Sequence, residues 1–244
     1  IIILFIVSTG AYSQKYIPFP EDSAEWFVEG ELIDGDGGPS TFRKDRFFVA
    51  GDTIVNDTSF IKLFVEKSST IYLIGLLYQD TINERVYFND LYGQNPELLF
   101  DFNLFIGQTF LFHHAGNITV EKVDFISING VNRKRITFDT NIRCGSHFEK
   151  LWFIEGIGSN AGPYPGNYLG LFVSVLTCYN EEGVSIYRLN LNEQACDLNT
   201  LILSKKDFSI IKKTSVYPNP FNEDIIIESK LFEKELITVK LINL

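Results

Sequence analysis

Residues 118–138 read ITVEKVDFISINGVNRKRITF. Two runs rich in β-branched and aromatic residues, 118–127 and 133–138, flank the pair Asn129-Gly130. An Asn-Gly pair between such runs is the strongest short-range signal for a β-hairpin, because both residues tolerate the positive φ that a two-residue turn requires. This stretch therefore predicts two antiparallel strands, and the rest of the chain repeats its pattern.

Short apolar runs separated by Gly, Asn and Asp continue on both sides of this hairpin. Nine more are predicted as strands: 25–32, 43–49, 59–65, 71–77, 85–88, 97–102, 150–155, 172–179 and 185–189. Residues 51–57 are predicted to link two of them, and no window shows a sustained helical period. The pattern predicts an all-β fold, an antiparallel meander forming a sandwich or a barrel-like body. It leaves those two forms open.

Composition narrows the class of protein. The chain has 244 residues, of which 45% are hydrophobic, and a net charge of −10. Such a chain is too apolar for intrinsic disorder, and its acidity argues against binding nucleic acid or anionic lipid. From Lys212 onward five lysines balance five acidic residues, so the whole excess of negative charge lies upstream.

The N-terminal residues have the pattern of a secretory signal peptide. Residues 1–7 read IIILFIV, and small residues follow at Ala11 and Ser13. We expect cleavage between Ser13 and Gln14. The sequence contains no methionine, so we expect residues 1–13 to be part of a longer signal peptide. A run of seven apolar residues is too short to span a bilayer, and no transmembrane segment is expected in the mature chain.

The C-terminal residues carry a second motif. Tyr217-Pro218-Asn219-Pro220 precedes two strand-like runs, 225–228 and 237–244. The prolines exclude a helix and favour an extended backbone. This stretch resembles the type A C-terminal sorting domain of the type IX secretion system (T9SS), also called the Por secretion tail. The resemblance implies a small Ig-like β-sandwich, of which this chain holds the first part.

The two terminal motifs together indicate how the chain is organised. We expect a partial signal peptide at 1–13, an all-β cargo domain at 14–203, a linker at 204–215 and the incomplete sorting domain at 216–244. The resemblance implies export by the type IX secretion machinery of a Gram-negative bacterium. The protein would then be secreted or held on the outer-membrane surface, with a surface glycolipid as one possible attachment.

The cargo domain carries a further resemblance. Trp152-Phe153-Ile154-Glu155-Gly156-Ile157-Gly158-Ser159 is similar to a segment of uncharacterised exported β-proteins with the same sorting domain. No catalytic activity is assigned to that group of proteins. The resemblance therefore implies a fold and a cellular location, and no active site. We expect a non-enzymatic binding or adhesion module for an extracellular glycan or protein, without a cofactor. The alternative is an exported hydrolase acting on glycan or peptide.

Three cysteines fit export to an oxidising compartment. We favour a disulfide between Cys178 and Cys196, which would close a short loop after a strand, although only geometry decides among the pairings. Cys144 would then be the unpaired thiol.

A few residues could carry chemistry. Asp101 and Glu155 lie at strand ends, as the two carboxylates of a glycosidase could, and Trp26, Trp152, Tyr164 and Tyr168 could stack on sugar rings. Cys144 and His147, with His113 or His114, have spacings compatible with zinc. Asp34 and Asp36 resemble the opening of a calcium loop that lacks its later ligands. For each of these groups of residues, a structural role in a turn, in a loop or in the hydrophobic core is the simpler interpretation.

Overall fold

The computed structural model divides the chain into two compact units, Ile1–Leu203 and Ser204–Leu244. It describes residues 15–32, 41–90, 96–112, 116–144, 147–164, 172–189, 193–199, 201, 214–217, 224–231 and 235–242.

An eight-stranded antiparallel sheet forms the larger part of the first unit. Its strand order is β13-β12-β1-β2-β3-β4-β5-β6. The bounds are β1 Ala24–Leu32, β2 Thr41–Val55, β3 Thr58–Lys67, β4 Thr70–Asp80, β5 Arg85–Asp90, β6 Glu97–Asp101, β12 Phe172–Glu181 and β13 Val184–Arg188. Six of these strands are consecutive in the chain, as a meander requires, and β12 returns late to pair with β1.

A five-stranded antiparallel sheet completes the first unit, in the order β11-β10-β9-β8-β7. Its strands are β7 Thr109–Phe112, β8 Gly116–Ile128, β9 Val131–Cys144, β10 His147–Ile154 and β11 Gly158–Ser159. All eleven strands predicted from the sequence are present. The short strands β7 and β11 were not predicted, because two to four residues are too few to show a period.

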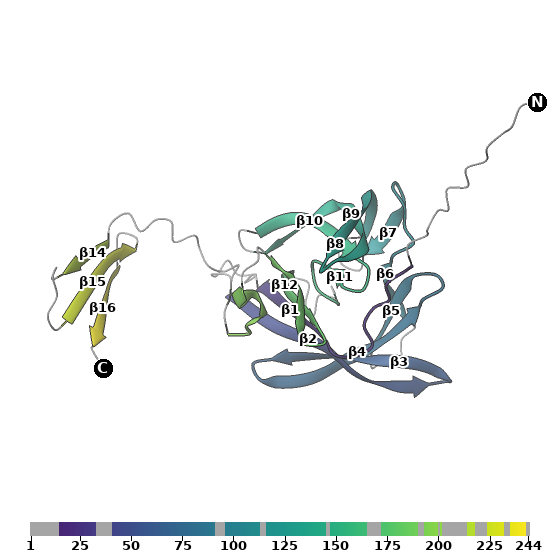
Figure 1. Ribbon diagram of the computed structural model, residues 1–244, viewed down its shortest axis with the longest axis horizontal. Helices are drawn as coiled ribbons and strands as arrows, with labels where there is room; N and C mark the ends of the chain where they lie inside the picture. The colour runs from purple at the N-terminus through teal and green to yellow at the C-terminus, as the bar shows by residue number, and fades with distance from the viewer. Residues whose placement is uncertain are drawn as a thin grey trace, which may run out of the picture. The chain divides into compact units, whose positions relative to one another are not determined.

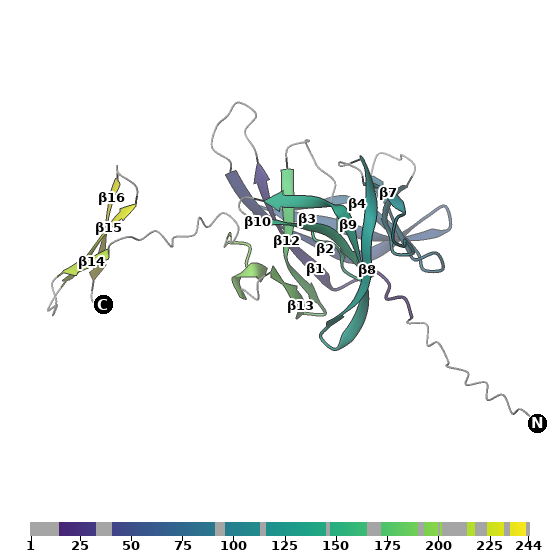
Figure 2. The same cartoon turned by 90° about the horizontal axis from the view of Figure 1, so that it is seen from above.

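The all-β prediction is confirmed, and the sheets are curled into half-barrels. In Figure 1, β8, β9 and β10 lie on one side of the first unit, and β2, β3 and β4 lie on the other; Figure 2 shows the long, bent path of β8 from above. Within the described part of the chain, no helix has the length and apolar character needed to cross a membrane.

One aromatic ring joins the cores of the two sheets. Phe153 on β10 is fully buried, and its ring centroid lies 5.0 Å from that of Phe100 on β6. The same ring lies 5.3 Å from Phe110 on β7 and 4.6 Å from Phe138 on β9. All three contacts of the Phe153 ring are edge to face, the arrangement that aromatic quadrupoles favour. Strands from both sheets therefore pack on one shared core.

The turns explain where the strands end. Asn129 and Gly130 have φ values of 49° and 76°, so the predicted two-residue hairpin turn is confirmed. The predicted link at residues 51–57 is wrong in extent. Strand β2 continues to Val55 through a bulge at Gly51, whose φ is 69°, and the turn consists of Asn56 and Asp57 alone. A glycine in the left-handed region makes such a bulge possible within one strand.

The second unit contains one described sheet. Its antiparallel order is β14-β15-β16, with β14 Thr214–Tyr217, β15 Asp224–Leu231 and β16 Glu235–Ile242. The two strand-like runs predicted after the proline motif coincide with β15 and β16. Tyr217 ends β14, which begins within the predicted linker, and Pro218, Asn219 and Pro220 lie outside the described residues.

We predict that Gly130→Ala lowers the free energy of unfolding by about 1 kcal/mol, because alanine at positive φ is strained while the site itself is open. Asp57→Gly is the matched control in the other hairpin, where Asp57 has a φ of 62°. That change relieves strain and should be neutral or stabilising. Urea denaturation of both variants tests this, and equal effects of the two substitutions would contradict it.

Candidate functional site

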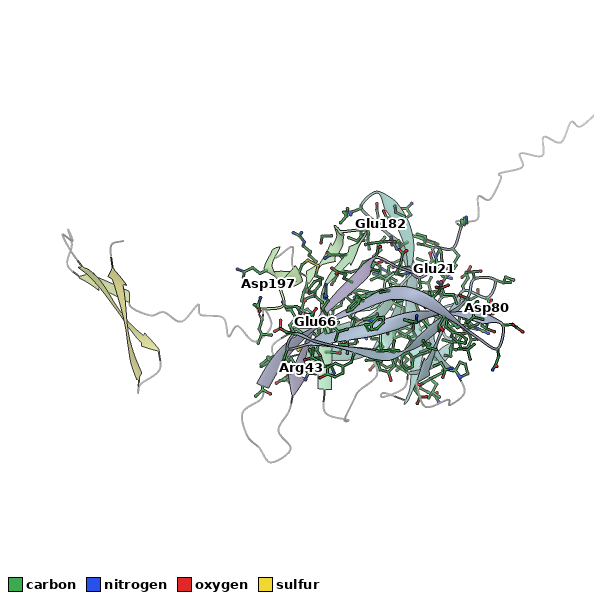
Figure 3. All side chains as sticks on the ribbon, turned by 90° about the horizontal axis from the view of Figure 1, so that it is seen from below. Glu21, Arg43, Glu66, Asp80, Glu182 and Asp197 are labelled. Atoms are coloured by element: carbon green, nitrogen blue, oxygen red, sulfur yellow. A yellow bond between two sulfur atoms is a disulfide. The ribbon has the colours of Figure 1, made fainter. Side chains whose placement is uncertain are left out.

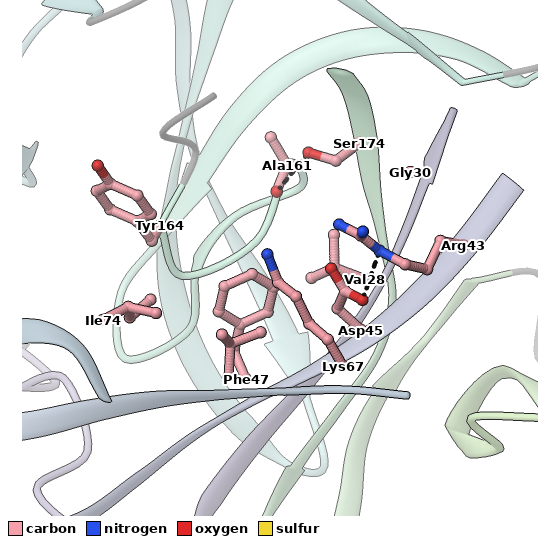
Figure 4. A pocket seen from close by; sticks show the side chains of 11 residues that line it. Val28, Gly30, Arg43, Asp45, Phe47, Lys67, Ile74, Ala161, Tyr164 and Ser174 are labelled. Atoms are coloured by element: carbon pink, nitrogen blue, oxygen red, sulfur yellow. Dashed lines mark hydrogen bonds and ion pairs between the residues drawn. The ribbon is translucent and has the colours of Figure 1, made fainter. Parts of the chain in front are cut away.

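A hollow of about 60 Å³ opens on the face of the large sheet that carries the core (Figure 4). Strands β1, β2, β3, β4 and β12 and the segment after β11 contribute to it. Its lining consists of Val28, Gly30, Arg43, Asp45, Phe47, Val65, Lys67, Ile74, Ala161, Tyr164 and Ser174.

Cross-strand register creates the space. Gly30 on β1 pairs with Ser174 on one side and with Arg43 on the other. Directly opposed residues project from the same face of a sheet, so the glycine leaves a gap between a hydroxyl and a guanidinium. Two residues along β1, Val28 pairs with Asp45 of β2. The register of β2 with β3 then places Lys67 of β3 on the other side of Asp45.

Two cations and one carboxylate meet in this hollow. Arg43 Nε lies 2.8 Å from Asp45 Oδ1. Burial raises the pKa of Asp45, while Arg43 and Lys67 oppose that rise. Burial likewise lowers the pKa of Lys67, which Asp45 opposes. Both groups are therefore partly desolvated.

The hollow thus holds charged groups of both signs within an acidic chain. Figure 3 shows acidic side chains on several parts of the first unit, among them Glu21, Glu66, Asp80, Glu182 and Asp197, and it labels Arg43 on another part of the same unit.

The remaining walls are apolar or hydroxylated. The Ser174 hydroxyl donates a hydrogen bond to the Ala161 carbonyl at 3.1 Å. The Tyr164 ring lies 4.2 Å from that of Phe88, with an angle of 31° between the planes. Val28, Val65 and Ile74 belong to the core and form the apolar lining. The site thus combines an aromatic edge, a hydroxyl and charges, the mixture typical of small ligand sites.

A buried loop holds the Ala161 wall in place. Residues 155–162 are all buried, although they are not a regular strand throughout. Three successive carbonyls in this loop accept hydrogen bonds from side chains. Arg133 donates to Glu155 at 2.9 Å, Tyr179 to Gly156 at 3.2 Å and Trp26 to Ile157 at 2.7 Å.

Asn160 fixes the far end of the same loop. Its side-chain oxygen accepts from the Trp152 amide at 3.0 Å, and its side-chain nitrogen donates to the Lys150 carbonyl at 2.8 Å. Its own carbonyl accepts from the Leu176 amide at 2.7 Å. A buried loop is stable only when its polar groups find such partners. The glycine-containing segment at residues 152–159 therefore has a structural role.

The opposite face of the sheet carries a second charged cluster. Lys44 and Glu29 are both buried, with 3.9 Å between Nζ and Oε2. Lys44 also donates to the carbonyls of Gln194 and Ala195 in the 3₁₀ helix η2, Glu193–Cys196. The Thr177 hydroxyl lies 2.9 Å from the Ala195 carbonyl. These contacts attach η2 to the sheet.

The disulfide prediction is confirmed. Cys178 on β12 and Cys196 at the end of η2 are bonded, with a Cα–Cα distance of 5.2 Å and a sequence separation of 18 residues. Cys144 is the free, buried cysteine among the described residues. The Cys178–Cys196 disulfide and the contacts of Lys44 therefore hold η2 against the same face of the large sheet.

The two predicted carboxylates have separate structural partners. Asp101 lies 2.9 Å from Arg85 Nε and accepts from the Asn103 amide at 2.9 Å. Glu155 accepts from the Lys134 amide at 3.3 Å, and burial raises its pKa. Each acid thus satisfies nearby donors at a strand end. Of the predicted sugar-stacking residues, Trp26 and Trp152 are buried, whereas Tyr164 borders the hollow.

The predicted metal ligands do not come together. The described residues contain no group of three or more His, Cys, Asp or Glu side chains placed to hold a metal ion. Burial, with Glu29 and Glu31, raises the pKa of Cys144 to about 12, so the thiol stays protonated and is a poor zinc ligand. His147 instead lies 3.3 Å from Glu149.

Several predicted residues lie outside the described part of the chain. These are Ser13, Gln14, Asp34, Asp36, His113, His114 and Tyr168.

Apart from Tyr164, the residues of the hollow were missed by sequence reasoning, although a signal for its charged residues exists. Residues 43–49 were predicted as a strand, and Arg43 and Asp45 alternate along it with the same period as Phe47 and Val49. Two charges on the core-facing side of a strand are unusual and mark a special environment.

We predict that Trp26→Phe lowers the free energy of unfolding by about 1–3 kcal/mol beyond the loss of volume, because the buried Ile157 carbonyl loses its donor. Trp152→Phe makes the same change in size at another buried position and is the control. Thermal or urea unfolding measures both, and equal losses would show that the indole hydrogen bond contributes nothing.

We predict that replacing both Cys178 and Cys196 with serine lowers the free energy of unfolding by about 3 kcal/mol, because the bond closes a short loop in the unfolded chain. Denaturation with and without a reducing agent tests this. Reduction should bring the wild type to the stability of the variant and leave the variant unchanged. A variant as stable as the oxidised wild type would contradict the prediction.

Comparisons with protein families, curated proteins and solved structures find no match for this chain. Its function is therefore inferred from the residues and the geometry described above.

Proposed function

We propose that this chain is a secreted or cell-surface protein exported by the type IX secretion system of a Gram-negative bacterium, and that its first unit is a binding or adhesion module. The observation that carries the binding role is the hollow over Gly30. Arg43, Asp45, Lys67 and Ser174 converge there on one small space with an apolar lining. Convergent polar groups in an apolar hollow are the usual mark of a ligand site.

Three features support the export route. Tyr217-Pro218-Asn219-Pro220 resembles the opening of the type A sorting domain, and residues 1–13 resemble a signal peptide. The disulfide is compatible with an oxidising compartment. The C-terminal strands belong to a compact unit separate from the large body. A sorting tag that is removed or attached to a surface glycolipid needs such independence from its passenger.

The alternative of an exported hydrolase has less support. Hydrolysis of a glycoside requires two carboxylates that face one substrate. Asp101 is held by Arg85, and Glu155 by a backbone amide of β9. These acids stabilise strand ends, so the geometry favours binding.

Cell fractionation tests the proposal. The protein is produced from its own gene in a host with type IX secretion, beside a variant deleted from residue 216 onward. We expect the wild type outside the outer membrane, with its C-terminal segment removed or modified, and the deletion variant in the periplasm. The same host without the secretion machinery is the control and should also retain the wild type in the periplasm. Wild type in the cytoplasm, or export of the deletion variant, would overturn the proposal.

A further inference from the structure

Strand β7 is an edge of the five-stranded sheet (Figure 1). It pairs with β8 on one side, and no other strand that the structure describes pairs with it. An edge strand carries backbone N–H and C=O groups that point away from its sheet. Natural proteins protect such groups with charges, a very short strand or a covering segment, because an unprotected edge pairs with other strands. The other edges of the two sheets show what this protection looks like here.

The remaining three edges of the two sheets are protected. Strand β11 has two residues, and both are buried. Strand β6 begins at Glu97 and ends at Asp101, so it carries a charge at each end. On β13 the Ser185 carbonyl accepts a hydrogen bond from the side chain of Asn129 at 3.4 Å, and the strand ends at Arg188.

The segment around β7 is uncharged and exposes apolar side chains. Residues 102–112 contain no Asp, Glu, Lys or Arg. Leu111 on β7 is 70% exposed, and Phe105 and Ile106 in the preceding turn are 63% and 62% exposed. The Gln108 amide donates to the Phe105 carbonyl at 3.1 Å, and the Gln108 side-chain oxygen accepts from the Phe105 amide at 2.9 Å. These two bonds hold the turn, so the apolar side chains have a defined position at the edge.

The backbone of β7 has groups available for a further strand. The Val120 amide of β8 donates to the Gln108 carbonyl at 2.8 Å, so the backbone of Gln108 faces β8. Hydrogen-bonding direction alternates along an antiparallel strand, and the N–H and C=O groups of Thr109 and Leu111 therefore point away from β8. Such an edge is complementary to an added antiparallel strand.

We propose that β7 pairs with β7 of a second copy of this chain, as antiparallel strands related by a two-fold axis at Phe110. This register places Thr109 opposite Leu111 of the second copy, and Leu111 opposite Thr109 of the second copy. The outward N–H and C=O groups of both residues then have partners in each copy. The two five-stranded sheets become one continuous sheet.

Two features favour a second copy over a strand of another protein. The chain has a net charge of −10, so two copies repel each other overall, whereas residues 102–112 bring no charge to the contact. A two-fold axis perpendicular to the sheet also keeps each face on its own side. Phe110 is buried in the core and Leu111 is exposed, so the core-facing sides of the two copies adjoin and both Leu111 side chains lie on the outer face.

Sedimentation equilibrium of the purified protein over a range of concentrations tests the inference. We expect a reversible equilibrium between monomer and dimer. A monomer at every concentration would overturn the inference and leave the edge to a different partner. Oligomers that grow beyond the dimer would overturn the closed two-fold arrangement.

One pair of variants tests the surface. Leu111→Lys should weaken dimerisation by about tenfold or more, because it places two like charges beside the axis. Phe148→Lys is the matched control, since Phe148 is 66% exposed and lies on β10, between β9 and β11. It should leave the dimer unchanged. Equal effects of the two variants, or no effect of Leu111→Lys, would overturn the assignment of the contact to β7. Thermal unfolding shows whether each variant is folded.

Amide hydrogen exchange tests the same contact on the wild type. The amides of Thr109 and Leu111 should exchange quickly in dilute solution and become protected at concentrations that favour the dimer. The amide of Phe110 faces β8 and is the internal control, protected at both concentrations. A dimer in which Thr109 and Leu111 exchange as fast as in the monomer would place the interface elsewhere. The inference goes beyond the proposed function, so an exported protein that stays monomeric overturns the dimer alone.

Discussion

Three buried side chains, Trp26, Arg133 and Tyr179, donate to consecutive carbonyls of the loop that follows β10. Trp26 and Tyr179 belong to the large sheet, and Arg133 belongs to the smaller one. A buried backbone without hydrogen-bond partners costs free energy at every unsatisfied group, so this loop can exist only where both sheets supply donors. The two sheets are therefore joined by polar bonds as well as by the apolar core, and the wall of the hollow depends on that junction.

The same loop shows why glycine is needed at one of its turns. Gly162 has a φ of 108°, and a Cβ there would lie 2.9 Å from the side chain of Val28. Val28 is part of the lining of the hollow, as is Ala161 beside Gly162. Close approach of the loop to β1 thus sets the distance between two walls of the site. A bulkier residue at Gly162 would move the loop and change the shape of the hollow.

The sequence was informative where structure is local. The Asn129-Gly130 turn and the strands around it follow from residue preferences within a few positions, and the Cys178–Cys196 bond was favoured because the residues are close in the chain. The hollow depends instead on residues about 130 positions apart, since Gly30 lies between Arg43 and Ser174 only after β12 has paired with β1. Register between distant strands is a property of the whole fold, and no local pattern encodes it.

The run of charges from Arg43 to Arg46 shows how one strand serves both faces of a sheet. Alternation places Arg43 and Asp45 at the hollow and Lys44 and Arg46 on the other side. Lys44 is held by Glu29 and the carbonyls of η2, so its charge stabilises the cover of that face. On the face with the hollow, Asp45 lies 2.8 Å from Arg43, and burial opposes the charged forms of Asp45 and Lys67. One strand thus supplies a buried cation beneath η2 and charged groups at the hollow that the proposed binding function would use.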